Sequence, residues 1–443
     1  MYLRRFTVEN IRSAPRVELS FKPGEEAGWH VLLGANGSGK SSLIRAFALV
    51  MMGEKEAYAS RQDFERWMRI DTDKSVIDAT VVADHEYDDV KGRGKAQSRP
   101  ISLSVHLERT SLDGAVALRF TGSGHLRTVW GGGNGWFSAS FGPFRRFTGG
   151  DNKYDRLFVT NKRLAPHLTA LGEDVALTDA MGWLSSLYLQ TLQDERHQLQ
   201  TGRLELLSAV LTFLNDNHFL PYGAEICGLD GETVEVQDGN LFKISLDQLS
   251  DGYRSALSMV LELIRQMVEL YGVDRMIESM TTVPGTVQAS GVVMIDEIDV
   301  HLHPTWQRDI GQWLIKCFPR VQFIVTTHSP IVCRSVALAD GQIKGTVWKL
   351  PNPGAEGQFR RIEGAELNQL VFGDVLDAYS TELFGSNVVR PETGVKKIER
   401  LAELNVKALL GRLSADEEAE RKALRKAFPG DAGTLVEGGN AQI

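Results

Sequence analysis

At 443 residues with 42% hydrophobic side chains, the chain is long enough to bury one large core and an additional lobe. A formal net charge of −8 at pH 7 excludes a general attraction to nucleic acid, so any contact with DNA or RNA has to be local. No apolar run approaches the roughly 20 residues that span a bilayer, the N-terminus has no signal-like apolar region, and Cys227, Cys317 and Cys333 are far apart, so we expect a cytoplasmic protein without membrane spans, zinc sites or disulfides.

The first predicted elements flank a glycine-rich loop. Residues 29–33 predict a buried strand and residues 42–52 an apolar helix. Between them, residues 34–41 match the pattern G-x-x-x-x-G-K-[ST] and are called the phosphate loop below, because its glycines let backbone N–H groups turn toward phosphate oxygens. We expect Lys40 to reach the β- and γ-phosphates of a nucleotide and Ser41 to hold Mg²⁺. The predicted nucleotide-binding residues are Gly34, Asn36, Gly37, Ser38, Gly39, Lys40, Ser41 and Ser42.

The middle of the chain changes from strands to helices. Residues 75–147 contain short apolar runs separated by Gly-rich turns and predict an antiparallel sheet on the nucleotide side. Residues 164–217 have apolar side chains at helical spacing and predict a helical lobe, which is far too short to form long coiled-coil arms.

A short polar motif follows this lobe. A predicted hairpin with Asp238-Gly239 at its turn leads to Leu-Ser-Asp-Gly-Tyr-Arg-Ser at residues 249–255, called the signature segment below. The apolar pattern then predicts a helix over residues 255–271.

Two further predicted strands end in polar side chains. Residues 291–295 predict a central parallel strand that places Asp296 and Glu297, the carboxylate pair, at its carboxyl end, where α/β sheets bind ligands. We expect Asp296 to bind Mg²⁺ through water and Glu297 to orient or deprotonate the water that attacks the γ-phosphate. Residues 321–325 predict another strand, and His328 beyond its end is suited to hydrogen-bond the γ-phosphate and sense its loss. The predicted catalytic residues are thus Lys40, Glu297 and His328, and the predicted metal ligands are Ser41 and Asp296.

The sequence after residue 351 is amphipathic and heavily charged. It predicts a helical appendage that docks on a partner or a sister subunit, with packing on its own domain as an equally weighted alternative. The predicted division of the chain is an N-terminal nucleotide-binding segment with the phosphate loop and the antiparallel sheet over 1–163, a helical lobe over 164–220, a second nucleotide-binding segment with the signature segment, the carboxylate pair and His328 over 221–350, the appendage over 351–428 and a disordered tail over 429–443.

Basic clusters are candidate nucleic-acid contacts, for which solvated surface charge is the favoured interpretation. They are Arg4, Arg5, Arg12 and Arg16 at the N-terminus, and Lys91, Arg93, Lys95 and Arg99 in a later loop. The pair Arg145 and Arg146 is equally suited to phosphate or to the surface.

In this order, the phosphate loop, signature segment, carboxylate pair and histidine resemble the ABC-type ATPase superfamily, in its SMC/RecF/OLD-like branch. The resemblance implies an α/β fold: an ABC-type ATPase head with a mixed and parallel sheet, an antiparallel β subdomain, a helical lobe and a C-terminal helical appendage. It also implies that ATP joins two heads, with Ser250 and Gly252 contacting the nucleotide of the other subunit. Residues 298–304 resemble the family's D-loop at the dimer seam, and residues 6–12 resemble its first strand and turn near the nucleotide.

Residues 137–146 and 180–184 further resemble bacterial anti-phage ATPases, such as the Septu subunit and retron-associated ATPases. This resemblance implies a regulatory and scaffold subunit that forms a homodimer or a higher oligomer and controls a nuclease or toxin partner. The sequence shows no recognisable nuclease motif of its own. A RecF-like DNA-repair ATPase that loads on DNA is the alternative, and a transporter subunit is disfavoured because only Gln62 is a weak glutamine-loop candidate.

Overall fold

The computed structural model divides the chain into two units, Met1–Phe372 and Gly373–Ile443. The structure describes residues 1–91, 99–110, 115–131, 134–143, 161–172, 179–220, 223–229, 234–245, 248–249, 251–300, 302–354, 358–373 and 392–428. The predicted tail, the paired arginines Arg145 and Arg146, and most of the basic loop around Lys95 lie outside these residues.

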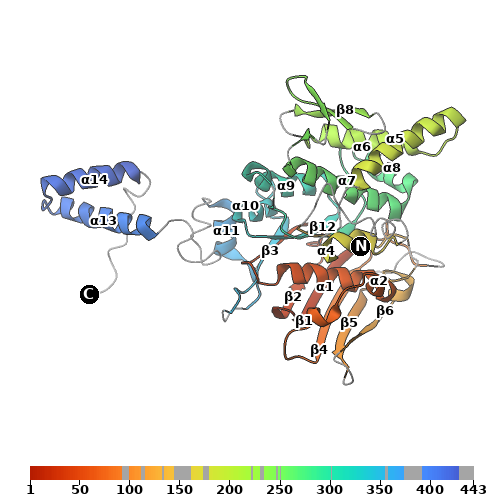
Figure 1. Cartoon of the computed structure of the whole chain (residues 1–443), viewed down its shortest axis with the longest axis horizontal. Helices are drawn as coiled ribbons and strands as arrows, with labels where there is room; N and C mark the ends of the chain where they lie inside the picture. The colour runs from red at the N-terminus through yellow and green to blue at the C-terminus, as the bar shows by residue number, and fades with distance from the viewer. Residues whose placement is uncertain are drawn as a thin grey trace. The chain divides into compact units, whose positions relative to one another are not determined.

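A mixed six-stranded sheet, the central sheet, forms the middle of the first unit (Figure 1). Its strands in spatial order are β14 (Arg360–Ile362), β13 (Gly345–Lys349), β3 (Gly28–Leu33), β12 (Val321–Thr327), β11 (Gly291–Ile295) and β7 (Ser138–Phe141). All neighbours are parallel except β13 and β14. Every residue of β3, β11 and β12 is buried, as expected for parallel strands covered on both faces. The strands predicted before the phosphate loop, before the carboxylate pair and before His328 are therefore confirmed.

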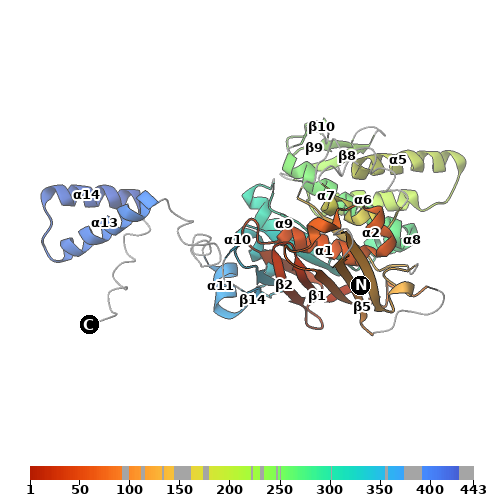
Figure 2. The ribbon, with the colours of Figure 1, turned by 60° about the horizontal axis from the view of Figure 1, so that its bottom comes forward.

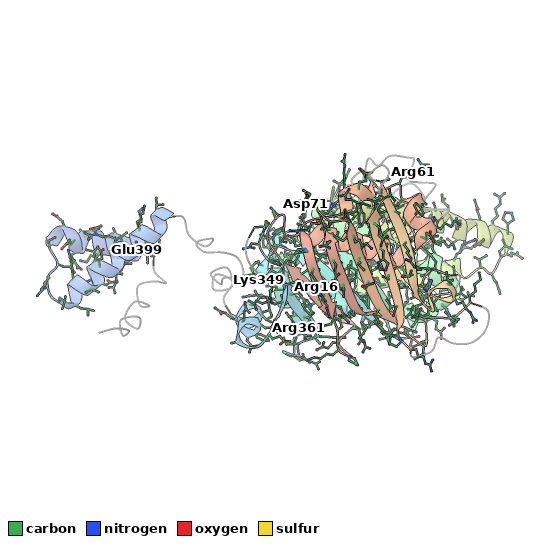
Figure 3. All side chains as sticks on the ribbon, turned by 90° about the horizontal axis from the view of Figure 1, so that it is seen from below. Arg16, Arg61, Asp71, Lys349, Arg361 and Glu399 are labelled. Carbon is green, nitrogen blue, oxygen red and sulfur yellow. The ribbon has the colours of Figure 1, made fainter. Side chains whose placement is uncertain are left out.

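An antiparallel sheet is also present and has five strands. In spatial order these are β2 (Ala14–Ser20), β1 (Tyr2–Ile11), β4 (Lys74–Val82), β5 (Ile101–Arg109) and β6 (Val116–Ser123). The bounds of this sheet differ from the predicted residues 75–147: it includes β1 and β2, and β7 belongs to the central sheet because it pairs in parallel with β11. Buried and exposed residues alternate along β4, which shows that only one face of this sheet packs on the core. Figure 3 shows the five strands side by side, with Arg16 near the edge formed by β2.

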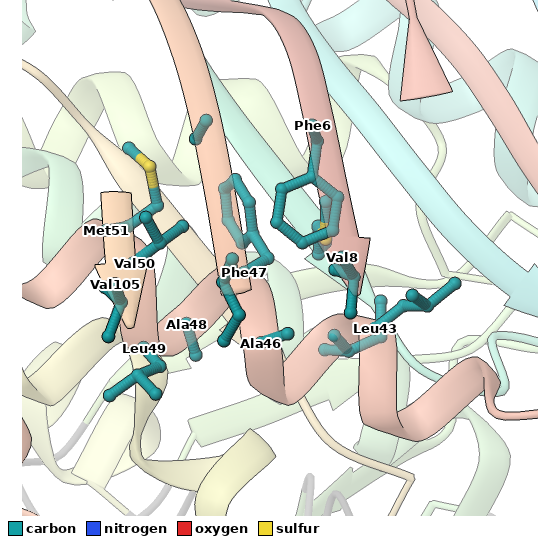
Figure 4. Packing of buried hydrophobic residues seen from close by; sticks show 14 of the residues in the cluster. Phe6, Val8, Leu43, Ala46, Phe47, Ala48, Leu49, Val50, Met51 and Val105 are labelled. Atoms are coloured by element: carbon teal, nitrogen blue, oxygen red, sulfur yellow. The ribbon is translucent and has the colours of Figure 1, made fainter. Parts of the chain in front are cut away.

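The helix after the phosphate loop, α1 (Lys40–Met52), contacts both sheets. The rings of Phe47 on α1 and Phe6 on β1 meet edge to face with centroids 6.1 Å apart (Figure 4). The same core includes Met294 of β11 and Ile324 of β12. It also includes the short elements η3 (Ala165–His167) and α4 (Leu168–Leu171), which the sequence had assigned to the helical lobe. Their apolar residues pack in this core, so the lobe begins after them.

The helical lobe contains helices and a small sheet. Its long helices α5 (Asp179–His197) and α6 (Arg203–Asp216) pack against each other, and α5 also packs on α7 (Asp251–Tyr271). Figure 2 shows a three-stranded antiparallel sheet beside them. It consists of β8 (Glu225–Leu229), β9 (Val234–Gln237) and β10 (Lys243–Ser245), and the predicted hairpin turn at Asp238 joins the last two strands.

Shorter elements complete the first unit. They are α2 (Glu54–Ala59), η1 (Phe64–Trp67), η2 (His125–Arg127), α8 (Val273–Thr281), α9 (Pro304–Cys317), α10 (Pro330–Cys333), η6 (Arg334–Val336) and α11 (Gly364–Phe372). The predicted start of the appendage at residue 351 needs correction, because β14 pairs with β13 and Arg361 pairs with Glu25 near the start of the chain. The first unit therefore continues to Phe372.

The second unit contains two described helices, α13 (Glu392–Leu409) and α14 (Ala415–Ala427), that pack against each other. Leu401 and Leu404 are fully buried between them. A capping box of Ser414 and Glu417 begins α14, as the Ser-x-x-Glu pattern predicts. In the part of the chain that the structure describes, no helix is both long and apolar enough to cross a membrane.

Two fully buried histidines are expected to make unfolding pH-dependent. Burial lowers the pKa of His30 to about 4 and that of His167 to about 3. Both are therefore neutral when folded, whereas the unfolded chain binds these protons near pH 6.5. Their stabilising effect is present above that pH and falls by about 1.4 kcal/mol per pH unit for each histidine as the pH drops toward the folded pKa.

Urea unfolding at a series of pH values from about 7 down to about 5 measures this slope. The His167→Gln variant does not titrate at this position and should lose the share of the slope that His167 contributes. An unchanged slope in that variant contradicts a neutral, buried His167.

Candidate nucleotide-binding site

The phosphate loop connects β3 to α1 in the first unit, and its backbone requires glycine at two positions. Gly37 and Gly39 have φ of 79° and 97°, in the left-handed region. A side chain at Gly34 would also meet the Ser38 hydroxyl oxygen at 2.5 Å. The loop therefore folds tightly enough to bring successive backbone N–H groups toward one ligand.

The loop also contains an unsatisfied polar group. The Ser38 hydroxyl is buried and has no hydrogen-bond partner among the described residues. A phosphate oxygen supplies the acceptor that such a buried donor needs. Helix α1 begins at Lys40, and its N-terminus favours an anion. The helix N-terminus and the Ser38 hydroxyl are therefore suited to bind the triphosphate of a nucleotide.

Lys40 lies at the centre of the site. Its ammonium group donates to the carbonyl oxygens of Gly34 (2.9 Å) and Ala35 (3.0 Å) and lies 2.8 Å from Nε2 of His328. Burial lowers the pKa of Lys40, and the nearby carboxylates of Glu297 and Asp296 oppose that shift. The phosphate loop, the carboxylate pair and the histidine thus converge on one cationic group, as the sequence predicted.

The carboxylate pair follows β11 directly. Asp296 is 2% exposed, and its Oδ1 accepts a hydrogen bond from the Thr326 hydroxyl at 2.5 Å. Glu297 is more exposed and has φ of 44°, a left-handed conformation that costs a non-glycine residue about 1–3 kcal/mol. Such strain at a polar strand end is typical of functional sites. The hydroxyl of Ser41, in the first turn of α1, and the Asp296 carboxylate are both hard oxygen ligands suited to Mg²⁺.

His328 follows β12 and faces both groups. Its Nε2 lies 3.9 Å from Oε1 of Glu297, in addition to the contact with Lys40. Burial, followed by the positive charge of Lys40, lowers the pKa of His328. The imidazole is therefore neutral near pH 7, and because an ammonium only donates, Nε2 accepts and the ring proton lies on Nδ1.

A second set of hydrogen bonds ties the strand ends together, and the sequence analysis did not assign it. The Thr327 hydroxyl donates to Oδ1 of Asp299 (2.6 Å), and the Ser329 hydroxyl donates to the side chain of Gln307 on α9 (3.0 Å). Gln307 in turn donates to the Asp299 carbonyl (3.2 Å). The only sequence signal was two adjacent threonines at the end of a buried strand.

The turn between β1 and β2 lies against the phosphate loop. A side chain at Gly39 would meet the Ser13 hydroxyl oxygen at 2.9 Å. The neighbouring Arg12 guanidinium lies 5.8 Å from the ring centre of Trp67, and burial together with Arg45 lowers its pKa. The turn between β1 and β2, near the start of the chain, therefore lies beside the candidate site, as the resemblance implied.

The signature segment is described in part. Ser250 and His301 lie outside the described residues. Gly252 is in the first turn of α7 and is partly exposed. Among the described residues, no hydrogen bond joins Gly252 to the phosphate loop of the same chain. The roles of Ser250 and Gly252 remain predictions.

The N-terminal arginines are largely neutralised by neighbouring acids. Arg4 pairs with Glu26, Arg5 with Glu18 at 2.9 Å, and Arg16 with Glu9 at 3.6 Å. This pairing supports the interpretation of these residues as surface charge. Gln62, the weak glutamine-loop candidate, donates to the Ser60 carbonyl at 3.5 Å.

Two family models match the chain. One, described as "AAA domain, putative AbiEii toxin, Type IV TA system", matches residues 154–334. The other, described as "Protein of unknown function (DUF2813)", matches residues 1–108. The first match includes the signature segment, the carboxylate pair and His328, and the second includes the phosphate loop.

The chain is also similar to curated proteins and to solved structures. The chain is 39% identical over 117 residues to "Retron Ec83 probable ATPase" of Escherichia coli, covering 26% of this chain and 19% of that protein. It is 24% identical over 350 residues to "Septu protein PtuA" of Bacillus mycoides (strain KBAB4), covering 77% of this chain and 40% of that protein. A structure titled "Crystal structure of the SmcHead bound to the C-winged helix domain of ScpA" is 13% identical, with a TM-score of 0.48, covering 83% of this chain and 99% of that one.

The chain thus spans about a fifth and two fifths of the length of these two curated relatives. Its mixed central sheet, with the phosphate loop between β3 and α1, has the mixed α/β arrangement that the sequence predicted. By sequence, this protein is similar to the probable ATPase of a retron and to the Septu protein PtuA.

Proposed function

We propose that this protein binds and hydrolyses ATP with Mg²⁺ at the site formed by the phosphate loop, the carboxylate pair and His328. The observation that carries the proposal is the convergence of three strand ends on Lys40, with His328 2.8 Å from its ammonium and 3.9 Å from Glu297. If these contacts of Lys40 only stabilised the fold, they would need neither the glycine-rich loop nor the strained backbone at Glu297. The ATPase names of the relatives support the same activity.

Each residue has a distinct task in this proposal. Lys40 and the loop amides bind the β- and γ-phosphates, and Ser41 and Asp296 hold Mg²⁺. When bound there, Mg²⁺ would supply positive charge that neutralises the phosphate oxygens. Glu297 orients the attacking water and accepts its proton, because its carboxylate is partly open to solvent beside Lys40 and His328. Once Lys40 has turned toward the nucleotide, Nε2 of the neutral His328 no longer has to accept from the ammonium, so the ring proton moves from Nδ1 to Nε2 and Nε2 donates a hydrogen bond to the γ-phosphate.

The active site is completed by a second copy of the chain. Ser250 and Gly252 bind the nucleotide held by the opposite phosphate loop, so ATP joins two heads and hydrolysis releases them. Support comes from the position of Gly252 at the N-terminus of the 21-residue helix α7, where backbone N–H groups favour an anion. Higher oligomers are then assemblies of such dimers.

In the cell, the protein serves as the regulatory and scaffold subunit of an anti-phage complex that controls a nuclease or toxin partner. The support is similarity to proteins of Septu and retron systems. The second unit offers a surface for that partner, because Val406, Leu409 and Leu410 are exposed near the end of α13. The RecF-like alternative has weaker support, since acids neutralise most of the N-terminal basic cluster.

Replacing Ser250 by arginine tests the composite site. We expect the Ser250→Arg variant to lose ATP turnover but to bind nucleotide as a monomer with the wild-type dissociation constant, because its own phosphate loop is intact. Phosphate release measures turnover, a fluorescent ATP analogue measures binding, and light scattering with Mg-ATP measures mass. Loss of binding together with turnover contradicts the arrangement between two subunits. Turnover at the wild-type rate contradicts any role for Ser250.

A further inference from the structure

Thr326, the penultimate residue of β12, is bonded to all three residues that follow β11. Its hydroxyl donates to Oδ1 of Asp296 at 2.5 Å and accepts from the backbone N–H of Glu297 at 2.8 Å. Its carbonyl accepts from the backbone N–H of Ile298 at 3.1 Å. Thr326 is 0% exposed, so water does not compete for these bonds.

These bonds hold the strained backbone of the segment that follows β11. Glu297 has φ of 44°, and its amide proton is held by the Thr326 hydroxyl. The same hydroxyl proton fixes one oxygen of Asp296. One hydroxyl group is therefore bonded to both members of the carboxylate pair, to the carboxylate of Asp296 and to the backbone of Glu297.

The next residue makes a separate connection. Thr327 faces the other side of the strand and donates to Oδ1 of Asp299 (2.6 Å), while it accepts from the Ser329 backbone (2.9 Å). Thr327 thus holds the segment after the carboxylate pair, whereas Thr326 holds the pair itself. His328 follows directly, so the spacing between the carboxylates and the imidazole depends on the strand end that Thr326 anchors.

We infer that Thr326 is a positioning residue for the hydrolytic step. It holds Glu297 in the conformation that directs its carboxylate at the attacking water, and it orients Asp296 through the same hydroxyl group. The inference rests on the proposed ATP hydrolysis, and it assigns to Thr326 an effect on turnover rather than on nucleotide binding. Lys40 and the phosphate loop make no hydrogen bond to Thr326 among the described residues.

Three variants of the full chain test this role. Thr326→Val keeps the shape of the side chain and removes the hydroxyl, and Thr326→Ser keeps the hydroxyl. Thr346→Val is the matched control: Thr346 lies on β13, is 2% exposed, and its hydroxyl also has two partners, His30 and Trp348 (both 2.9 Å). The strands β3 and β12 lie between β13 and β11, so Thr346→Val separates a loss of packing from a loss of position at the carboxylate pair.

We expect Thr326→Val to lower kcat by about 10- to 100-fold with little change in KM for ATP, because a small displacement of a catalytic group has effects of that size. Thr326→Ser should recover most of the wild-type kcat, and Thr346→Val should retain it. Amide hydrogen exchange on the nucleotide-free protein gives a second readout. The Glu297 amide should exchange faster in Thr326→Val than in the wild type or in Thr326→Ser.

The outcomes of these experiments separate the role of Thr326 from the proposed ATP hydrolysis. A wild-type kcat in Thr326→Val overturns the inference, as does an unchanged exchange rate of the Glu297 amide. A kcat that falls equally in Thr346→Val shows a general packing effect and also overturns it. Absence of hydrolysis in the wild-type protein refutes the proposed function instead, and the exchange rate then decides alone whether Thr326 holds the carboxylate pair.

Discussion

Replacement of Glu297 by glutamine is expected to lower kcat for ATP by on the order of 10²- to 10⁴-fold, the usual contribution of a general base. Glutamine has the shape of glutamate but accepts no proton from the attacking water. The backbone N–H of residue 297 should keep its bond to Thr326, so the strained loop is retained. ATP binding persists and the ATP-joined dimer accumulates, which mass measurement by light scattering with Mg-ATP detects.

The control for this experiment is the same chemical change away from the site. Glu363 is an exposed carboxylate whose described ion pair is with Arg361, and Glu363→Gln should hydrolyse ATP at the wild-type rate. If Glu297→Gln also hydrolyses normally, Glu297 is not the base, and the assignment passes to another group near the γ-phosphate. If the Glu297→Gln variant is inactive but never dimerises with Mg-ATP, the proposal that the signature segment of one subunit binds the nucleotide of the other is wrong.

Replacement of Lys40 by alanine is expected to weaken ATP binding by about 100-fold or more. Hydrogen bonds to a charged group contribute about 1.5–3 kcal/mol, and Lys40 is expected to reach two phosphates. Titration with a fluorescent ATP analogue measures the dissociation constant. Because the charge of Lys40 lowers the pKa of His328, that pKa should rise in the variant, which NMR titration of the imidazole can follow.

Lys55, an exposed lysine on α2, provides the matched control. Lys55→Ala removes the same charge from the chain without touching the site, so its ATP affinity should equal that of the wild type. Equal affinities of Lys40→Ala and the wild type are incompatible with a phosphate-binding role for the loop. A change in ATP affinity without a change in the His328 pKa contradicts the contact between the two side chains.

The local elements of the site could be predicted because each has a strong and contiguous pattern. The largely apolar runs at residues 29–33, 291–295 and 321–325, interrupted only by His30 and Gln322, are long enough to mark buried parallel strands. The phosphate loop has fixed spacing, which follows from the close approach of backbone to phosphate. The order of these patterns along the chain was sufficient to place Lys40, Glu297 and His328 together.

Other features depend on pairing between distant residues, which no local pattern encodes. The bonds of Thr326 to the loop after β11 require the register of two parallel strands, in which Ile295 lies beside Val325. The neutralisation of Arg5 by Glu18 likewise depends on the register of β1 and β2. The sequence analysis ended the first unit too early because it did not predict β14. This strand has only three residues, which are too few to show an alternating pattern.

The location of α1 between the two sheets has a consequence for how the first unit folds. Eleven of its 13 residues are buried, and they supply apolar contacts to both sheets. Removing the helix leaves each sheet with an uncovered apolar face, so neither sheet is an autonomous folding module. Residues 1–108 and 154–334, which match separate family models, are therefore parts of one cooperative structure. We therefore expect that neither segment folds stably when it is expressed alone.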